Sequence, residues 1–267
     1  MPMIEINDEN YLDHVDHVGD DGQQRVRGLI PRNYKTHPVG CYASIPPMTG
    51  LKLMTDSEIE AAIRRKNIDA SWLSDHRDRG MFGSRIPSRD QNGKGYCWFH
   101  SGVSANLLVR ARDNQPYADL SAFSGACIIK GYRDEGGWGA EGVEWQQENG
   151  CATSKTWPQQ SMARSNDTPA MRAEAALYKP TGVWADMQPR DNRALATCLC
   201  NNDPVVVDYN WWGHSVCACK LVSWNPFKIL IWNSWGDSWS EFGMGELAGG
   251  KATPDGQVAL MTVRAAA

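Results

Sequence analysis

Residues 89–98, RDQNGKGYCW, place a glutamine six residues before a cysteine that is followed directly by a tryptophan. Gly93 and Gly95 indicate a loop, after which residues 97–112 carry apolar side chains at helical intervals. The cysteine, Cys97, is therefore expected in the first turn of a helix. The partial positive charge at that end of a helix favours the thiolate, so Cys97 is the candidate nucleophile.

Gln91 supplies a second property that such a thiol needs. A thiolate that attacks an amide carbonyl creates an oxyanion, and hydrogen-bond donors must stabilise it. The side-chain amide of Gln91 and the backbone N–H of Cys97 can act as those donors. The loop is thus predicted to carry both the nucleophile and part of its oxyanion site.

His214 and Asn233 complete the candidate site. His214 begins a strand pattern, and Asn233 follows 19 residues later in WNSWG, residues 232–236. An imidazole can take the thiol proton and later give it to the leaving amine, while an amide fixes the tautomer of the ring. A single histidine is more often structural than catalytic, but the order Cys97, His214, Asn233 is the order that such a site needs.

Composition limits the classes of function. The chain has 267 residues, of which 42% are hydrophobic and 22% charged, as is typical of a globular protein with one large domain or two lobes. Its formal net charge is −4, from 27 basic and 31 acidic residues without long runs of one sign. We therefore expect neither nucleic acid nor a membrane surface as a partner.

The N-terminal residues, MPMIEINDEN, lack the basic and apolar regions of a secretory signal. No stretch approaches the roughly 18 consecutive apolar residues of a membrane span. The sequence leaves the location open, and it favours a cytoplasmic or particle-associated protein over a secreted one.

The eight cysteines are interpreted as thiols rather than as disulfides or metal ligands. Cys217 and Cys219 alternate along a buried strand pattern, and Cys198 and Cys200 lie near the end of a predicted helix. The C-x-C spacing is tighter than that of the usual zinc motifs, and no histidine lies at a matching offset. No metal site and no cofactor are predicted.

Helical patterns dominate the first part of the chain and strand patterns the last part. Helices are predicted at residues 55–66, 97–112, 140–149, 171–178 and 193–200, and strands at residues 204–209, 215–222 and 228–232. Thr55 and Glu58 form a capping box at the start of the first helix. We predict an N-terminal extension or arm at residues 1–70, a domain at residues 71–247 and a flexible C-terminal tail at residues 248–267.

Four separated motifs resemble the papain family of cysteine peptidases. They are the nucleophile segment at residues 89–98, a Gly-Gly turn at residues 135–137, a histidine segment at residues 213–216 and an asparagine segment at residues 233–236. Each motif is weak alone, and together they are strong. The resemblance spans roughly residues 71–247 and implies an α+β fold of two lobes, one helical and one β-rich, with the active-site cleft between them.

The resemblance also implies a role for each matching residue. The catalytic roles fall on Cys97 as nucleophile, His214 as general base and acid, Asn233 as orienting amide and Gln91 as oxyanion donor. Gly136 and Gly137 would bind the backbone of the substrate, where a side chain would block the approach. Trp235 would cover the His–Asn hydrogen bond. The expected partner is a peptide or protein substrate.

Two positions depart from the pattern of the family. Lys94 and Asp134 stand where papain-like enzymes usually carry a disulfide, and we predict that they form an ion pair instead, which fits a reducing compartment. His100 replaces an aromatic core residue and is interpreted as packing between the lobes with a hydrogen-bond partner; the alternative is that it perturbs the thiol. Shortened loops between the Gly-Gly turn and Asn233 leave the substrate preference open.

The N-terminal extension lacks the helical charge pattern associated with the inhibitory pro-segments of this family. It could cover the cleft, dock a partner or anchor the protein in an assembly.

Three functions fit the sequence. The first is a papain-like cysteine peptidase that hydrolyses peptide bonds through a Cys97 thioester, with His214 as base and acid. The second is a papain-fold structural or binding module of a larger assembly, for example a virus particle, with weak or unused chemistry. The third is a cell-wall peptide amidase, which shares the chemistry but needs a cleft for short branched peptides.

Overall fold

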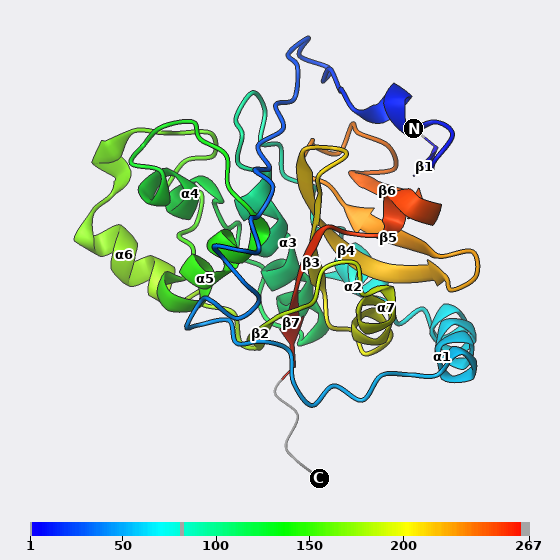
Figure 1. Cartoon of the computed structure of the whole chain (residues 1–267). Helices are drawn as coiled ribbons and strands as arrows, with labels where there is room; N and C mark the ends of the chain where they lie inside the picture. The colour runs from blue at the N-terminus through cyan, green and yellow to red at the C-terminus, as the bar shows by residue number, and fades with distance from the viewer. Residues whose placement is uncertain (1, 81–82, 263–267) are drawn as a thin grey trace.

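The computed structural model describes residues 2–80 and 83–262, and it divides into a helical half and a sheet half (Figure 1). The helices are α1 (Asp56–Asp69), α2 (Leu73–Arg79), α3 (Cys97–Arg112), α4 (Phe123–Ile129), α5 (Gly139–Asn149), α6 (Pro169–Ala176) and α7 (Asn192–Cys200). The strands are β1 (Ile4–Ile6), β2 (Val183–Asp186), β3 (Val205–Tyr209), β4 (His214–Ser223), β5 (Lys228–Trp232), β6 (Met244–Ala248) and β7 (Gly256–Met261), and short 3-10 helices are η1 (Tyr11–His14), η2 (Arg164–Asn166) and η3 (Gly249–Ala252). The predicted α+β class is confirmed.

The seven strands form one sheet in the order β1-β6-β5-β4-β3-β7-β2. Its pairs are antiparallel except for β1 with β6, which is parallel. Every residue of β3, VVVDY, is buried, because the sheet is covered on both faces. Val206 packs in the core cluster that contains α3 and α5, whereas Val205 and Val207 pack in the cluster that contains α7. This alternation follows from the two-residue period of a strand.

Helix α3 positions the nucleophile. It begins at Cys97, as the sequence predicts, and almost all of its 16 residues are buried. The helix contacts α5 on the helical side and α2, β3 and β4 on the sheet side. Cys97 therefore lies at the N-terminal end of the helix that joins the two halves.

The predicted C-terminal tail from residue 248 is wrong for residues 248–262. After β6 and η3, strand β7 pairs antiparallel with both β3 and β2, and all but its last residue are buried. The strand is short and its sequence, GQVALM, includes a glycine and a glutamine, so its stability comes from two distant neighbours rather than from local propensity. Residues 263–267 of the predicted tail lie outside the described part of the chain.

The N-terminal residues run along both halves of the molecule. Strand β1 forms the edge of the sheet beside β6, Pro47 forms a bridge with Asp186, and α1 contacts α7. The predicted capping box of α1 is confirmed, with Thr55 and Glu58 bonded reciprocally. In Figure 1 this part of the chain, blue to cyan, passes between the helical half and the strands before it reaches α1.

The cysteines are thiols, and all of them except Cys41 are buried. The expected burial of Cys198, Cys200, Cys217 and Cys219 is confirmed. No helix within residues 2–80 and 83–262 is long and apolar enough to cross a membrane. Within those ranges, no cluster of three or more His, Cys, Asp or Glu residues is arranged to hold a metal ion.

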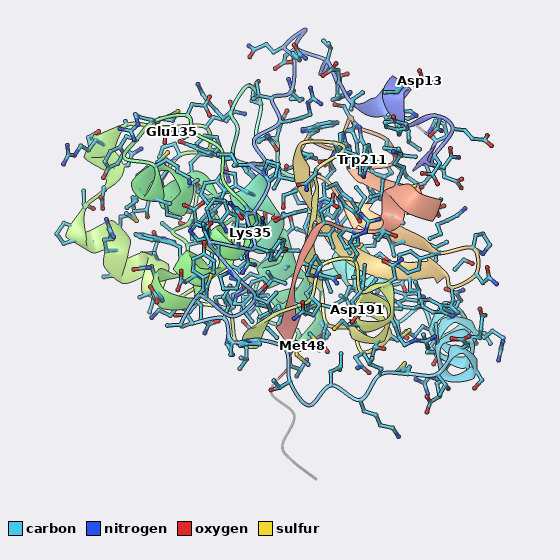
Figure 2. The ribbon with its side chains drawn as sticks, in the orientation of Figure 1. Asp13, Lys35, Met48, Glu135, Asp191 and Trp211 are labelled. Atoms are coloured by element: carbon cyan, nitrogen blue, oxygen red, sulfur yellow. The ribbon has the colours of Figure 1, made fainter. Side chains whose placement is uncertain are left out.

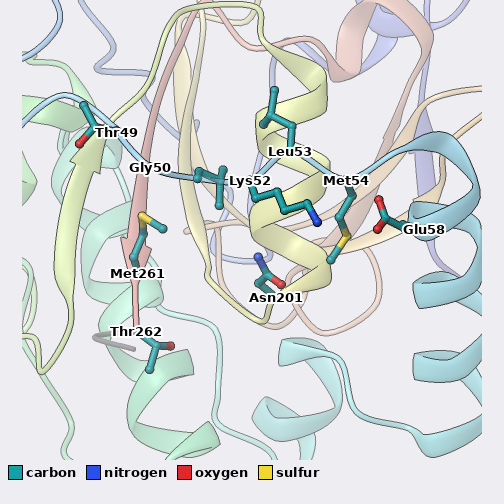
Figure 3. A pocket seen from close by; sticks show the side chains of 10 residues that line it. Thr49, Gly50, Lys52, Leu53, Met54, Glu58, Asn201, Met261 and Thr262 are labelled. Carbon is teal, nitrogen blue, oxygen red and sulfur yellow. The ribbon is translucent and has the colours of Figure 1, made fainter. Parts of the chain in front are cut away.

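A pocket of about 440 Å³ lies beside the end of β7 (Figure 3). Its walls come from residues 49–54, Glu58, Asn201, Met261 and Thr262. None of the candidate catalytic residues lines it, so this pocket is separate from the candidate site.

Candidate active site

Cys97 is fully buried, and its thiol contacts the N-terminal part of the chain. The backbone N–H of Gly28 donates to Cys97 Sγ at 3.3 Å. Burial raises the pKa of the thiol to about 12, although backbone N–H groups of Ser215 and Gly28 act to lower it. The expectation that the helix terminus favours the thiolate is thus wrong for this closed arrangement, because desolvation outweighs the charge at the end of the helix.

His214 and Asn233 lie together, as predicted. His214 Nε2 is 2.7 Å from Asn233 Oδ1, which also accepts a hydrogen bond from the backbone N–H of Ser234 at 2.7 Å. Because an N–H group identifies that atom as the amide oxygen, Nε2 must carry the proton of a neutral ring. Nδ1 is then the basic nitrogen, and it is buried without a hydrogen-bond partner in the described structure. Burial lowers the pKa of His214 to about 4, against an opposing effect of the Asn233 hydrogen bond.

Two tryptophans enclose the imidazole. The ring of Trp235 lies 4.7 Å from that of His214 at an interplanar angle of 32°, and the ring of Trp212 lies 4.9 Å away at a steeper angle of 65°. Both tryptophans are fully buried. This geometry suits the covering role that the sequence assigns to Trp235, which itself stays a prediction.

Gln91 connects the nucleophile loop with the asparagine segment. Its Oε1 accepts a hydrogen bond from Ser234 Oγ at 2.5 Å. Its Nε2 donates to the carbonyl oxygens of Val26 at 2.6 Å and of Lys94 at 2.8 Å. The amide that the sequence predicts as an oxyanion donor is therefore present beside the site, and a carbonyl from the N-terminal part of the chain occupies it.

The Gly-Gly turn holds an extended backbone. The N–H of Gly137 donates to the carbonyl of Gly28 at 3.0 Å, and the carbonyl of Gly137 accepts from the N–H of Ile30 at 2.8 Å. A Cβ atom on Gly136 would lie 2.5 Å from the Gly28 carbonyl oxygen. Glycine is required there because the two backbones approach so closely.

Residues 26–30, which we call the cleft segment, thus contact the nucleophile segment, the Gly-Gly turn and the histidine segment. Val26 bonds Gln91, Gly28 bonds Cys97 and Gly137, and the N–H of Leu29 donates to the carbonyl of Gly213, next to His214, at 3.0 Å. In Figure 2, Lys35, a few residues after the cleft segment, lies in this view between Glu135 on the helical side and Trp211 on the strand side. The chain therefore fills its own cleft.

The cleft segment is not placed for attack by the thiol. Nucleophilic attack requires a carbonyl carbon near the sulfur. Cys97 Sγ instead faces the N–H of Gly28, and the carbonyl of Gly28 turns to Gly137. Leu29 pairs with Gly137 in the parallel sense. The segment is thus held as an occupant of the cleft rather than as a bond to be cut.

Ion pairs made by two buried arginines hold the segment on both sides. Before it, Arg25 bonds Asp21 at 2.8 Å and Asp90 of the nucleophile loop at 2.6 Å. After it, Arg32 makes two bonds to Asp186, at 3.0 and 2.8 Å. The side chains of both arginines are almost fully buried, and so is that of Asp186, so loss of Arg32 would leave a buried carboxylate without its cation. Asp21 and Asp90, in contrast, are 40% and 28% exposed.

Sequence reasoning assigned no role to Gly28, Arg25 or Arg32. A signal for the segment is present in VRGLIP, residues 26–31, where a glycine, two apolar residues and a proline favour an extended strand-like conformation. That pattern does not say which surface the segment covers.

Lys94 and Asp134 form the predicted ion pair, with 3.6 Å between Nζ and Oδ2. Both side chains are about one-third exposed, and Asp134 Oδ1 also accepts from the N–H of Gly95 at 2.8 Å. We expect Lys94→Met to change the free energy of unfolding by less than about 1 kcal/mol, because exposed pairs contribute little. Urea unfolding measures this difference. A loss of more than about 2 kcal/mol would show that the ion pair stabilises the fold about as much as a disulfide does.

His100 is buried and packs edge-on against Phe123, with ring centroids 5.8 Å apart at 86°. Its burial is confirmed, but this ring contact lies within the helical half, so packing between the lobes stays a prediction. The predicted hydrogen-bond partner is wrong, because neither ring nitrogen has one within the described residues. Burial lowers the pKa of His100 to about 3. The ring is therefore neutral in the folded protein at any moderately acid pH.

His100→Phe is expected to make the folded protein less sensitive to acid. The unfolded chain binds a proton at His100 near pH 6.5 and the folded chain only near pH 3, so the wild type loses stability as the pH falls from 6.5 toward 3. At pH 5 this loss amounts to about 2 kcal/mol, and it is absent in the variant. Urea unfolding at pH 7 and at pH 5 gives the change in unfolding free energy with pH for the wild type and for the variant. An equal change with pH in both proteins would mean that His100 binds a proton as readily in the folded state as in the unfolded state.

Known proteins share this arrangement of helices and strands, although no family model matches the chain. Papain from Carica papaya is 23% identical over 93% of this chain and 70% of its own length. Xylellain, a cysteine protease from Xylella fastidiosa, superposes with a TM-score of 0.62 at 18% identity, over 89% of this chain and 96% of that one. Digestive procathepsin L 3 of Tenebrio molitor larval midgut superposes with a TM-score of 0.54 at 16% identity, over 66% of each chain, which is just under two thirds.

Proposed function

The chain has the papain-like two-lobe fold, and we propose that it is a cysteine peptidase held inactive by its own cleft segment. The observation that supports this most directly is the content of the cleft. Cys97, Gln91 and Gly137 already bind an extended backbone, with hydrogen bonds to one run of five residues. A surface that binds one extended peptide in this way can bind another.

Each polar group has a definite role once the cleft segment leaves. His214 Nδ1 takes the proton of Cys97, and the thiolate attacks the carbonyl carbon of the substrate. Gln91 Nε2 and the backbone N–H of Cys97 stabilise the oxyanion. His214 then gives its proton to the leaving amine, and a thioester remains on Cys97. Water, deprotonated by His214, hydrolyses that thioester and restores the thiol.

Asn233 acts through His214 rather than on the substrate. Its oxygen keeps the proton of the ring on Nε2, so that Nδ1 stays basic. Trp235 and Trp212 exclude water from this hydrogen bond, since both rings lie against the imidazole.

The extended backbone in the cleft favours a linear peptide over a short branched one, which supports a peptidase rather than a cell-wall amidase. A binding module would keep the same segment in place permanently. The alternatives therefore differ in whether the cleft opens and which peptides it then accepts.

Labelling with a thiol-reactive epoxide tests the proposal. We expect the epoxide to modify Cys97 once the cleft segment has been displaced, and Cys97→Ala to abolish that modification and all cleavage of a linear peptide library. Mass spectrometry of the labelled protein identifies the modified residue. Labelling that remains slow and spread over several cysteines after displacement would favour the binding module, and cleavage of branched cell-wall peptides alone would favour the amidase.

A further inference from the structure

A buried carboxylate lies beside the Gly-Gly turn with one oxygen unused. Asp208, in β3, interrupts an otherwise apolar strand and is 6% exposed. Its Oδ2 accepts a hydrogen bond from the backbone N–H of Gly139 at 2.9 Å. Its Oδ1 has no partner within normal hydrogen-bond geometry among the residues that the structure describes; the side chain of Ser215 is near enough to lower the pKa of Asp208 but not to complete that geometry. A buried carboxylate oxygen without a good hydrogen bond lowers the stability of the fold, so the bond to Gly139 accounts for Oδ2 but not for Oδ1.

The carboxylate is close to the substrate-binding backbone. Gly139, to which it is bonded, lies two residues beyond Gly137, a span of about 7 Å at most. Asp208 is also near the nucleophile, because its charge acts to raise the pKa of Cys97. A long side chain that starts from the residue paired with Gly137 can therefore reach it.

The N-terminal part of the chain covers this carboxylate. A Cβ atom on Gly256 would lie 3.1 Å from Tyr34 Oη and 3.2 Å from Asp208 Oδ2, so the Tyr34 hydroxyl and the carboxylate both lie beside that glycine. The residue that now pairs with Gly137 is Leu29, which is 9% exposed. Displacement of residues 29–34 would open Asp208 to the cleft.

Arg32 is a cation near Asp208, but it is already bonded to another carboxylate. Arg32 lies close enough to act on the pKa of Asp208, but it is bonded to Asp186. Burial raises the pKa of Asp208 to about 6. The side chain of Ser215, the hydrogen bond from Gly139 and the charge of Arg32 act to lower it, whereas the charge of Asp186 acts to raise it further. The carboxyl group is therefore ionised at neutral pH and lacks a cation of its own.

We infer that Asp208 makes the cleft select arginine or lysine at the substrate position that replaces Leu29 against Gly137. A guanidinium or ammonium group supplies the donor that Oδ1 lacks, and charge-assisted hydrogen bonds are the strongest that a side chain can make. Leu29 cannot supply it. The cleft segment thus leaves this interaction to the substrate, and a basic peptide displaces the segment more readily than an apolar one. The inference rests on the proposed function.

Peptides that vary at one residue test the inference. In the Gly28→Asn background, where a Cβ atom would clash with the Gly95 carbonyl oxygen and is expected to displace the cleft segment, a positional library of residues before the cleaved bond should show one position with a preference for Arg or Lys. Asp208→Asn, which keeps an acceptor for Gly139, should lower kcat/KM for the Arg peptide at least about tenfold. It should change kcat/KM for the matched Leu peptide less than about threefold. Asp78→Asn, an exposed acid paired with Arg85, is the matched control and should change neither.

Asp208→Glu keeps the charge and should keep the basic preference, which guards against a folding defect in Asp208→Asn. Circular dichroism confirms that each variant folds. If Asp208→Asn cleaves Arg and Leu peptides in the same ratio as its parent, the inference is wrong while the proposed function stands.

Binding without chemistry separates the two proposals. In Gly28→Asn with Cys97→Ala, fluorescence anisotropy measures the affinity for the same labelled peptides. Tighter binding of the Arg peptide that depends on Asp208, without cleavage by the parent, would support the inference and overturn the peptidase. Equal binding of both peptides, with or without Asp208, would overturn the inference.

Discussion

Gly28→Asn is expected to raise the rate of Cys97 alkylation at neutral pH by at least about 100-fold. A Cβ atom at this position would lie 1.8 Å from the carbonyl oxygen of Gly95 and 2.2 Å from its carbonyl carbon. No rotamer relieves a Cβ clash with backbone, so the cleft segment must leave its place. The bonds from Gly28 to Cys97 and Gly137 are then lost together.

The size of the effect follows from the state of the thiol. Burial raises the pKa of Cys97 to about 12, whereas the pKa of an exposed thiol is about 8.5. Restored contact with water raises the thiolate fraction by up to about three orders of magnitude, since each unit of pKa is a factor of ten. Access of the reagent adds to this factor. Iodoacetamide labelling followed by mass spectrometry gives the rate at Cys97 alone.

Gly22→Asn is the matched control. Gly22 belongs to the same N-terminal part, and a Cβ atom added there would meet no atom within 4 Å. Its φ is positive, at 73°, which asparagine tolerates. This variant should be alkylated at the wild-type rate. If Gly28→Asn folds and is also alkylated at that rate, the cleft segment does not protect the thiol.

His214→Ala is expected to lower kcat by about 10⁴-fold in the Gly28→Asn background. The imidazole has two tasks, to take the proton of Cys97 and to protonate the leaving amine. His100, three residues after Cys97 on the same helix, is a poor substitute, because its pKa is about 3 and it has no hydrogen-bond partner in the described structure. Steady-state cleavage of a fluorogenic peptide measures the loss.

His100→Phe separates the two histidines. It should leave kcat and its pH profile unchanged, because His100 acts only through packing against Phe123. A loss in His100→Phe that matched the loss in His214→Ala would show that His214 is not the only base. A His214→Ala variant within about tenfold of its parent would contradict general-base catalysis by His214.

Local signals in the sequence predict the elements that local physics determines. Helix α1 has its capping box, and α3 begins at Cys97 after two glycines in the loop. Strands β3, β4 and β5 have apolar runs long enough to recognise. The pairing of His214 with Asn233 follows from order and residue type, and the structure places them in contact.

Other features depend on partners that are distant in the sequence. Strand β7 is held by β2 and β3, which lie well before it in the chain, and β1 is held by β6 near the other end. No local pattern says that residues 26–30 meet Cys97. The predicted direction of the thiol pKa shift is wrong for the same reason, since a helix terminus is visible in the sequence and burial by a remote segment is not.

The parallel pairing of β1 with β6 has a consequence for the release of the cleft segment. The chain is anchored before that segment by this pairing and after it by the contacts of residues 47 and 48 with Asp186. A segment tethered at both ends competes with substrate at a local concentration in the millimolar range, without dilution. A single cut between the anchors would loosen it yet leave both pieces attached. The cut protein would then keep its native mass, and its two fragments would separate only under denaturing conditions.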